Sequence, residues 1–327
     1  MILITGANGF VGSNVQKKLI AYNDQVCVLI RNPIDGISEK VRVIIGDIAK
    51  LQSLDSAMKE CDTVFHCAAY ISFQKKDFDK AHQVNVIGTR NVLEAALQAG
   101  VKKVVHLSAC AVLGFSKDKN TILDETANPT IEKDNVYAYT KKLAEDEVQK
   151  YVQKGLNVSI ANIATVYGQG DKKLNSGSVI KSVYEGKMKI VPPGGTSFVS
   201  VDDLVDGLIL LADKGKPGER YIFCTENMEY KSLVQRIART LNVKGPEHTL
   251  PRISYYPALC AVKGMELLSG LAKKDINLMT PQILKESFGY KYFGSAKAQN
   301  ELGWKPQQTF EEAVKKAFNY YKENHLI

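Results

Sequence analysis

The sequence has little of what marks disulfide-bonded, metal-binding or membrane-spanning proteins. Its six cysteines are dispersed, none forms a C-x-x-C pair, and none is spaced with the five histidines as a metal site requires. No uninterrupted apolar run is long enough to cross a bilayer. The first strand is predicted to begin at Met1, which leaves no room for a signal peptide. These absences predict reduced thiols, no metal, no transmembrane segment and a cytoplasmic location.

Acidic residues are also few relative to basic ones. Asp and Glu number 35 against 43 Lys and Arg, which gives a formal net charge of +8 and a pI of about 9.0. The lysines are scattered in pairs such as Lys102-Lys103 instead of forming a long basic block, and no nucleic-acid-binding motif is present. We therefore expect no nucleic-acid partner, and a surface with some attraction for phosphate groups.

What the sequence does contain begins with a glycine turn. Residues 2–5 are a mostly β-branched run that predicts a buried strand, and residues 13–22 carry the apolar spacing of a helix. Between them stand Gly6, Gly9 and Gly12, three residues apart. Glycines let the backbone come close to a ligand, and a helix N-terminus presents free N–H groups to an anion. The motif predicts a phosphate-binding loop, with an ordinary strand-to-helix turn as the alternative.

Strand and helix signals alternate through the first half of the chain. Apolar strand patterns recur at residues 25–30, 41–45, 62–69, 101–107 and 158–163. Helical patterns lie between them, including residues 50–61 and 77–100. This alternation predicts βαβ units in an α/β fold with a parallel sheet, and an active site over the carboxyl ends of the strands.

A tyrosine and a lysine four residues apart are the candidate catalytic pair. Tyr137 and Lys141 would lie on one face of a helix, one turn from each other. A free tyrosine has a pKa near ~10, and a neighbouring lysine cation stabilises the phenolate and lowers that value. Tyr137 could then exchange a proton with a substrate oxygen. Tyr139 is a weaker candidate because Leu143 occupies the position four residues after it. An isolated Tyr-x-x-x-Lys pair can also be an ordinary pair on a helix surface.

Together these motifs resemble the extended short-chain dehydrogenase/reductases, the NAD-dependent epimerase/dehydratase superfamily. The chain is most similar to its dihydroflavonol-4-reductase-like and hopanoid-associated sugar-epimerase-like members. The segments that carry the resemblance are residues 5–12, His66 to Ala69, Asn85 to Thr89, Tyr137 to Glu145, Pro192 to Gly195, Gly218 to Ile222 and Ser295 to Pro306. The resemblance implies a doubly wound (Rossmann) parallel sheet with a smaller, mostly helical C-terminal substrate lobe.

The resemblance also implies a dinucleotide and the residues that hold it. Arg31 follows the second strand, where an acid would bind the ribose of NAD and an arginine can receive the 2′-phosphate of NADP, so we expect NADP over NAD. Tyr137 would be the acid/base and Lys141 its assistant. The residues placed at the cofactor are Gly6, Asn8, Gly9, Phe10, Val11, Gly12, Arg31, Asp47, Ile48, Ala68, Ala69, Tyr137, Lys141, Ile163 and Val166.

The third catalytic position departs from the family pattern. Relatives carry Ser or Thr five residues before the glycine that closes this segment, and counting back from Gly114 reaches Ala109. Ser108, one residue earlier, is the candidate replacement, although successive strand residues face opposite ways. Three explanations stay open: Ser108 serves through a local backbone adjustment, water or another donor replaces the hydroxyl, or the protein is a weak or inactive relative.

The expected organisation is a core and a lobe. Residues 1–168, with 196–224 returning, would form the NADP-binding core, and residues 169–195 and 225–327 the substrate lobe. The favoured activity is NADPH-dependent reduction of a small-molecule carbonyl, an aldehyde or ketone. One alternative is a nucleotide-sugar epimerase or dehydratase with tightly bound NAD, acting on a sugar substrate. Another is a non-catalytic NADP-binding relative. A homodimer is compatible with the resemblance.

One stretch of the second half is unusually apolar. Residues 255–272 predict a helix whose side chains are mostly hydrophobic. We predict that it is the packed core of a lid over the substrate. A lipophilic-substrate wall, or a helix that touches a membrane with the help of nearby lysines, is the alternative.

Overall fold

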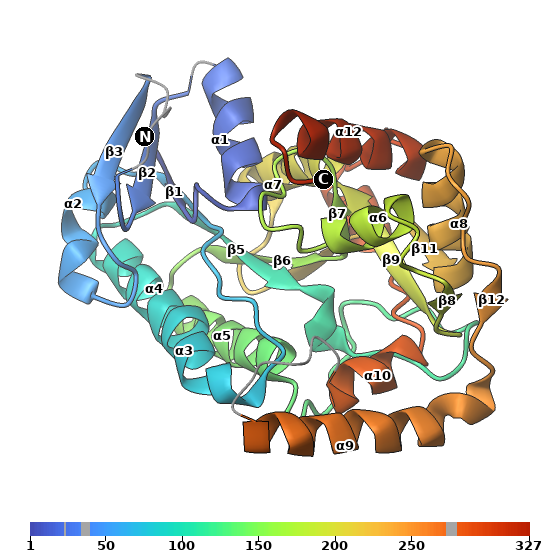
Figure 1. The fold of residues 1–327 in the computed structure, drawn as a ribbon. Helices are drawn as coiled ribbons and strands as arrows, with labels where there is room; N and C mark the ends of the chain where they lie inside the picture. Colours follow the sequence, from blue (N-terminus) through green and yellow to red (C-terminus); the bar gives the residue numbers. More distant parts are fainter. Residues whose placement is uncertain (23, 34–39, 273–279) are drawn as a thin grey trace.

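Seven strands lie side by side in one parallel sheet (Figure 1). They are β1 (Ile2–Thr5), β2 (Val26–Ile30), β3 (Val41–Ile45), β4 (Thr63–His66), β5 (Lys103–Ala109), β6 (Val158–Ile163) and β10 (Arg220–Phe223). Their spatial order is β10-β6-β5-β4-β1-β2-β3, so the chain runs outward from β1 in one direction and from β4 in the other. Ligands bind doubly wound sheets at such a reversal, outside the carboxyl ends of the strands. The predicted fold class is confirmed.

Helices cover both faces of this sheet in the computed structural model, which describes residues 1–22, 24–33, 40–272 and 280–327 (Figure 1). The covering helices are α1 (Phe10–Ala21), α2 (Asp55–Met58), α3 (Phe78–His82), α4 (Gly88–Gln98), α5 (Val136–Gln153) and α7 (Val201–Lys214). Neighbouring strand residues enter different cores. Leu3 packs in the cluster that holds Leu93 of α4, whereas Ile4 packs in the cluster that holds Val15 of α1 and Leu204 of α7. Strands buried on both faces explain why the sequence shows continuous apolar runs without alternation.

The second half adds small sheets and a further helical cluster. The strands are β7 (Thr165–Tyr167), β8 (Ile190–Val191), β9 (Gly195–Ser200), β11 (Glu226–Glu229) and β12 (His248–Thr249). The helices are α6 (Gly177–Tyr184), α8 (Tyr230–Thr240), α9 (Tyr255–Ala272), α10 (Pro281–Ser287), α11 (Ala296–Leu302) and α12 (Phe310–Glu323). β11, in the predicted lobe, pairs with β9, in the predicted core. The two parts therefore share a sheet, and their division at the predicted residues stays a prediction.

Two predicted helices differ from the structure. Residues 50–61 hold only a 3-10 turn, Leu51–Ser53, and the one-turn helix α2. Ser53 is the physical reason, because its hydroxyl hydrogen-bonds the backbone of Asp47 and Lys50 and so competes with helical bonding. Residues 77–100 are helical, but a π-helical segment, Gln83–Ile87, separates α3 from α4. Such segments often occur at functional sites.

Candidate active site

The glycine turn is folded tightly on itself and against the end of β4. Gly6 has a φ of +70°, and a Cβ on it would lie 2.6 Å from the backbone nitrogen of Ala68. A Cβ on Gly12 would lie 2.3 Å from the carbonyl oxygen of Gly6. The backbone N–H of Gly9 donates to the same oxygen over 2.9 Å. Side chains at the first and third glycines would therefore collide with backbone, which cannot move aside as a flexible side chain can.

The N-terminus of α1 follows directly and is free of side-chain caps. Gly9 is its N-cap, no side chain caps it, and its first turn contains no acidic residue. Its first N–H groups are thus available to an anion. Asn14 fixes this end, because its Nδ2 donates to the carbonyls of Phe10 over 2.8 Å and of Gln169 over 3.0 Å. Of the other residues predicted for this loop, Asn8 lies between Gly6 and the N-cap Gly9, and Val11 lies in the first turn of α1.

The other residues predicted to hold the adenosine end follow neighbouring strands at the same sheet edge. Arg31 is exposed after β2. Asp47 follows β3, and its Oδ1 accepts from the backbone of Ala49 over 3.0 Å. Ile48 is buried and held by Asn91, whose Nδ2 donates to the Ile48 carbonyl over 2.8 Å. Because parallel strands end at one edge, the structure brings these residues to the edge that carries the glycine turn.

Two polar residues of the family motifs have structural partners. His66 is buried between the hydroxyls of Thr5, 2.8 Å away, and Thr89, 3.0 Å away. Burial lowers the pKa of His66 to about 3, so the ring is neutral. Asn85 accepts from the backbone N–H of Tyr70 over 2.8 Å and donates to its carbonyl over 2.9 Å. It therefore fixes the loop that carries Ala68 and Ala69 past the end of β4.

The catalytic pair lies at the start of α5. Asn135 caps this helix by accepting from the N–H of Ala138 over 3.4 Å, and Tyr137 is the second helical residue. The Tyr137 ring meets Phe73 edge-on, with 5.9 Å between ring centroids. Lys141 is buried one turn later and donates from Nζ to the carbonyl of Leu107. Tyr137 and Lys141 are thus on one helix face beside the end of β5, as predicted.

Burial determines the protonation of both groups. It raises the pKa of Tyr137 to about 12 and lowers the pKa of Lys141 to about 8. The sequence predicted that Lys141 would lower the pKa of Tyr137. In the structure the loss of hydration outweighs that effect, and the ammonium is bound to Leu107. At neutral pH Tyr137 therefore keeps its proton and Lys141 is mostly charged.

Ser108 is used in a buried polar network. Its hydroxyl donates to Glu145, which also accepts from Nδ2 of Asn162 over 2.8 Å and from Nε of Arg220 over 2.8 Å. Glu145 lies eight residues after Tyr137, which is about 12 Å along the helix axis. The single hydroxyl proton of Ser108 is committed to that carboxylate, so in this arrangement it is not available to a substrate oxygen. Successive side chains of a strand point to opposite faces, so Ser108 points to the other face of β5 from Ala109, toward Glu145.

A Ser108→Ala variant should therefore lose stability more than activity. Glu145 would keep its burial and lose one donor, so we expect the free energy of unfolding to fall by roughly 1–3 kcal/mol. The kcat/KM for the reaction proposed below should fall less than tenfold. Denaturant unfolding and steady-state kinetics measure the two quantities, and Ala109→Ser, expected to be equally or more active, is the companion variant. A loss of roughly 10²–10³ in rate at unchanged stability would instead make Ser108 the missing donor.

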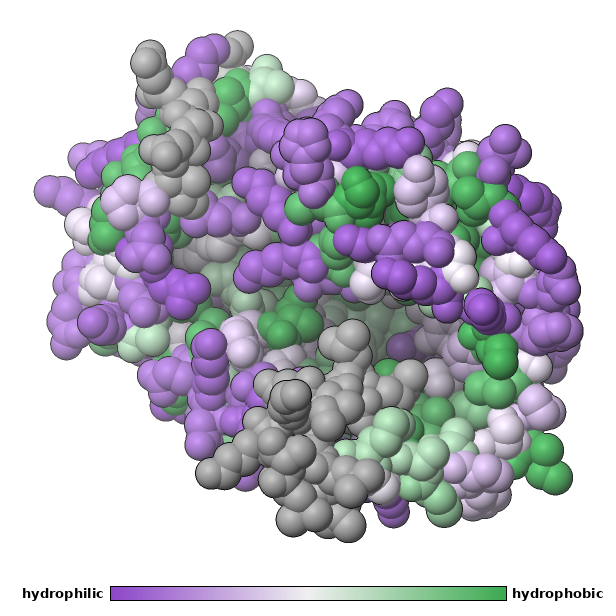
Figure 2. All heavy atoms as spheres, viewed as in Figure 1, coloured by the Kyte–Doolittle hydropathy of each residue, from purple (hydrophilic) through white to green (hydrophobic). Residues whose placement is uncertain are grey.

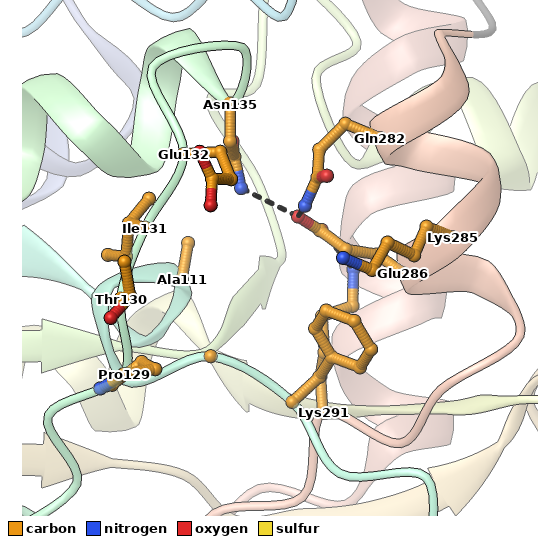
Figure 3. Close-up of a pocket in the computed structure, with 12 residues that line it drawn as sticks. Ala111, Pro129, Thr130, Ile131, Glu132, Asn135, Gln282, Lys285, Glu286 and Lys291 are labelled. Carbon is orange, nitrogen blue, oxygen red and sulfur yellow. Dashed lines mark hydrogen bonds and ion pairs between the residues drawn. The ribbon is translucent and has the colours of Figure 1, made fainter.

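A pocket beside α5 contains polar residues that the sequence motifs did not reveal (Figure 3). The loop before α5 and the 3-10 turn Cys110–Leu113 form one wall, and α10 forms the other. Glu286 of α10 accepts from Asn135 Nδ2 over 2.7 Å and from Gln282 Nε2 over 3.0 Å, and lies 3.5 Å from Lys291 Nζ. Asn135 thus joins the catalytic helix to α10. The two partners are 151 residues apart, so no local pattern could show the contact.

Comparison with known proteins identifies the family. The model of the NAD dependent epimerase/dehydratase family matches residues 2–224, and the chain belongs to that family. The crystal structure of gox2253 superposes with a TM-score of 0.86 at 32% identity, over 99% of this chain and 98% of the other. Sterol demethylase protein B of Methylococcus capsulatus is 29% identical over 99% of both chains. A Synechocystis protein, provisionally named a dihydroflavonol 4-reductase, is 28% identical over 98% of this chain and 94% of its own.

Proposed function

We propose that this protein is an NADPH-dependent reductase of a carbonyl compound. The observation that carries the proposal is the placement of Tyr137 and Lys141 on one face of α5, beside the sheet edge that bears the glycine turn. A proton donor and a cation then lie at the same sheet edge as a loop suited to a dinucleotide. The name of the Synechocystis relative, a dihydroflavonol 4-reductase, describes the same class of reaction and supports the proposal.

The residues of the glycine turn fit a dinucleotide. The turn leaves no room for a Cβ at Gly6 or Gly12, and the uncapped start of α1 offers N–H groups to a pyrophosphate. Gly9, Asn8, Phe10 and Val11 would complete this cradle, and Arg31, Asp47 and Ile48 would hold the adenosine end. Ala68 and Ala69 would allow close approach, and Tyr137, Lys141, Ile163 and Val166 would hold the nicotinamide end. When bound, the cofactor supplies the hydride.

The chain itself supplies the proton. Tyr137, with a pKa of about 12, is protonated at neutral pH and can donate to the oxygen of the carbonyl. The phenolate that remains is stabilised by the charged Lys141 on the same helix face. Its bond to the Leu107 carbonyl keeps the ammonium in place. A protonated Tyr137 beside a charged Lys141 is the arrangement that a proton donor in a reduction needs.

Arg31 supports NADPH over NADH and gives the experiment that tests the proposal. A charged hydrogen bond to a 2′-phosphate contributes roughly 1.5–3 kcal/mol. We expect turnover of NADPH with at least one member of a panel of aldehydes, ketones, dihydroflavonols and 3-keto sterols. Arg31→Ser should reduce the preference for NADPH over NADH by about tenfold or more, whereas Arg42→Ser, which removes an exposed arginine paired with Glu60, should not. Epimerisation of a nucleotide sugar, with NAD retained through purification, would instead make the protein an epimerase. Cofactor binding without turnover of any compound of the panel would make it a non-catalytic relative.

Lys141 predicts a pH limit for the reaction. Its pKa of about 8 lies below the ordinary value of 10.5, so its charge is present below pH 8 and is lost as the pH rises through 8. We expect kcat/KM for reduction to fall above about pH 8, because this ratio reports groups of the free enzyme. In Lys141→Arg the guanidinium stays charged, so the fall in kcat/KM above about pH 8 should disappear. A flat wild-type profile from pH 7 to 10 would contradict this role of Lys141.

A further inference from the structure

Over residues 255–265, the part of α9 whose side chains the structure describes, the helix packs through one face. Its inner face follows the i, i+3, i+4, i+7 spacing and consists of Tyr255, Ala258, Leu259 and Val262. These side chains lie in one apolar cluster with Leu284 of α10 and with Phe288, which directly follows α10. The rings of Tyr255 and Phe288 are 5.3 Å apart between centroids. This face of α9 therefore packs against the α10 segment, and the opposite face needs a separate explanation.

The outer face of α9 is apolar where a surface helix is normally polar. Ile253, just before the helix, is 82% exposed, and Tyr256 is 73% exposed. These are the two most exposed large hydrophobic side chains among the described residues. The outer face, called here the α9 surface, comprises Ile253, Tyr256, Pro257, Cys260, Ala261, Lys263 and Met265, all of them exposed. Figure 2 shows its apolar atoms along the lower right edge, where Figure 1 places the start of α9.

The charged residues of the chain segment that carries the α9 surface are all basic. No acidic residue occurs between Glu247 and Glu266, whereas Arg252 and Lys263 both lie in this interval and are exposed. A second copy of the chain on a two-fold axis would set this surface against itself, so bases would face bases without an acid to pair with. An anionic surface complements both the bases and the net charge of +8.

We propose that the α9 surface docks on an anionic lipid bilayer, with the helix lying in the plane of the interface. Exposed aromatic and aliphatic side chains flanked by basic residues are typical of helices that bind in this way. Among the described residues no helix has the length and hydrophobicity to cross a membrane, so the contact is peripheral. Docking does not depend on the proposed function.

The position of α10 relates docking to the choice of substrate, an inference that rests on the proposed function. α10 packs on the inner face of α9 and also lines the pocket beside Asn135 with Gln282 and Glu286. A docked protein would hold this pocket close to the bilayer surface. The substrate class inferred for the reductase is therefore a lipophilic carbonyl compound that partitions into membranes.

The test is sedimentation of the full-length protein with lipid vesicles, without cofactor or substrate. We expect binding to mixed phosphatidylcholine–phosphatidylglycerol vesicles, weaker binding to pure phosphatidylcholine, and weakening by salt. The double variant Ile253→Ser/Tyr256→Ser should lose at least tenfold in partitioning. The matched control is Ile122→Ser/Tyr22→Ser, which removes side chains 60% and 58% exposed elsewhere on the molecule and should bind like wild type. Circular dichroism and thermal melts establish that both variants fold.

Three results would overturn docking. The first is that the wild-type protein does not bind vesicles, and the second is that both double variants lose binding equally. The third is that the wild-type protein does not bind vesicles but forms a dimer in light scattering, and that Ile253→Ser/Tyr256→Ser abolishes this dimer whereas the control variant does not. Vesicle binding without turnover of any carbonyl would leave docking in place and refute the reductase. Turnover of water-soluble carbonyls alone, with vesicle binding intact, would remove the lipophilic substrate class and leave docking.

Discussion

The Tyr137→Phe variant is expected to lose about 10³-fold or more in kcat/KM while it still binds the cofactor. General acid catalysis by a positioned side chain contributes typically 10²–10⁴-fold, and phenylalanine removes only the hydroxyl that provides it. The edge-on contact with Phe73 needs the ring and not the hydroxyl, so the fold should persist. Stopped-flow and steady-state oxidation of NADPH measure the rate, and fluorescence titration measures cofactor binding.

Tyr139→Phe is the matched control for this variant. Tyr139 lies on the same helix, its ring is 6.2 Å from that of Phe78, and Leu143 follows it by four residues. The same hydroxyl is removed from a tyrosine without a lysine partner, so the rate should change less than threefold. If both variants lose rate equally, the effect belongs to the helix and not to proton transfer. An unchanged rate in Tyr137→Phe would remove Tyr137 as the acid.

The second large effect is expected from Gly6→Ala. Alanine at a φ of +70° is strained by roughly 1–2 kcal/mol. Its Cβ would also lie 2.6 Å from the nitrogen and 2.7 Å from the Cα of Ala68, both backbone atoms. The end of β1 or of β4 must shift, and the N-terminus of α1 shifts with it. We expect the free energy of unfolding to fall by roughly 3 kcal/mol or more and cofactor affinity to drop at least 100-fold.

Gly100→Ala separates the two causes. Gly100 has a φ of +71°, nearly that of Gly6, but nothing lies within 4 Å of a Cβ placed on it. This variant should show only the conformational strain and normal cofactor affinity. Denaturant unfolding and NADPH titration of both variants provide the comparison. Equal losses in the two variants would mean that the contact with β4 is unimportant.

Patterns that act over short distances predicted the fold well. Strand β2 lies within the predicted residues 25–30, because apolar residues in a parallel strand that is buried on both faces leave a continuous apolar run. The helix expected at residues 50–61 failed because one hydroxyl, that of Ser53, competes for backbone groups. The spacing of apolar residues carries no information about a side-chain hydroxyl that hydrogen-bonds the backbone. The interruption by the π-helical segment Gln83–Ile87 was likewise invisible, since one extra residue in a turn barely alters the apolar period.

The candidate site was predictable to the extent that it follows strand ends. Arg31, Asp47 and the glycines reach one edge because parallel strands must end there. Pairings between distant segments were not predictable. The sequence offered Ser108 as a donor, and only the packing of β5 against α5 shows that Glu145 binds its proton. The bond between Asn135 and Glu286 likewise arises from tertiary packing, without a motif on either side.

The fully parallel sheet also sets the order in which this protein can fold. No pair of its strands can form as a hairpin, and β1 must wait for β4, since Ile2 pairs with Thr63. The entropy of closing such loops is lost before the contacts form, which slows folding. Gly6 meets Ala68 only through that late pairing. A chain emerging from the ribosome therefore cannot complete its glycine turn until β4 has been synthesised and has paired with β1.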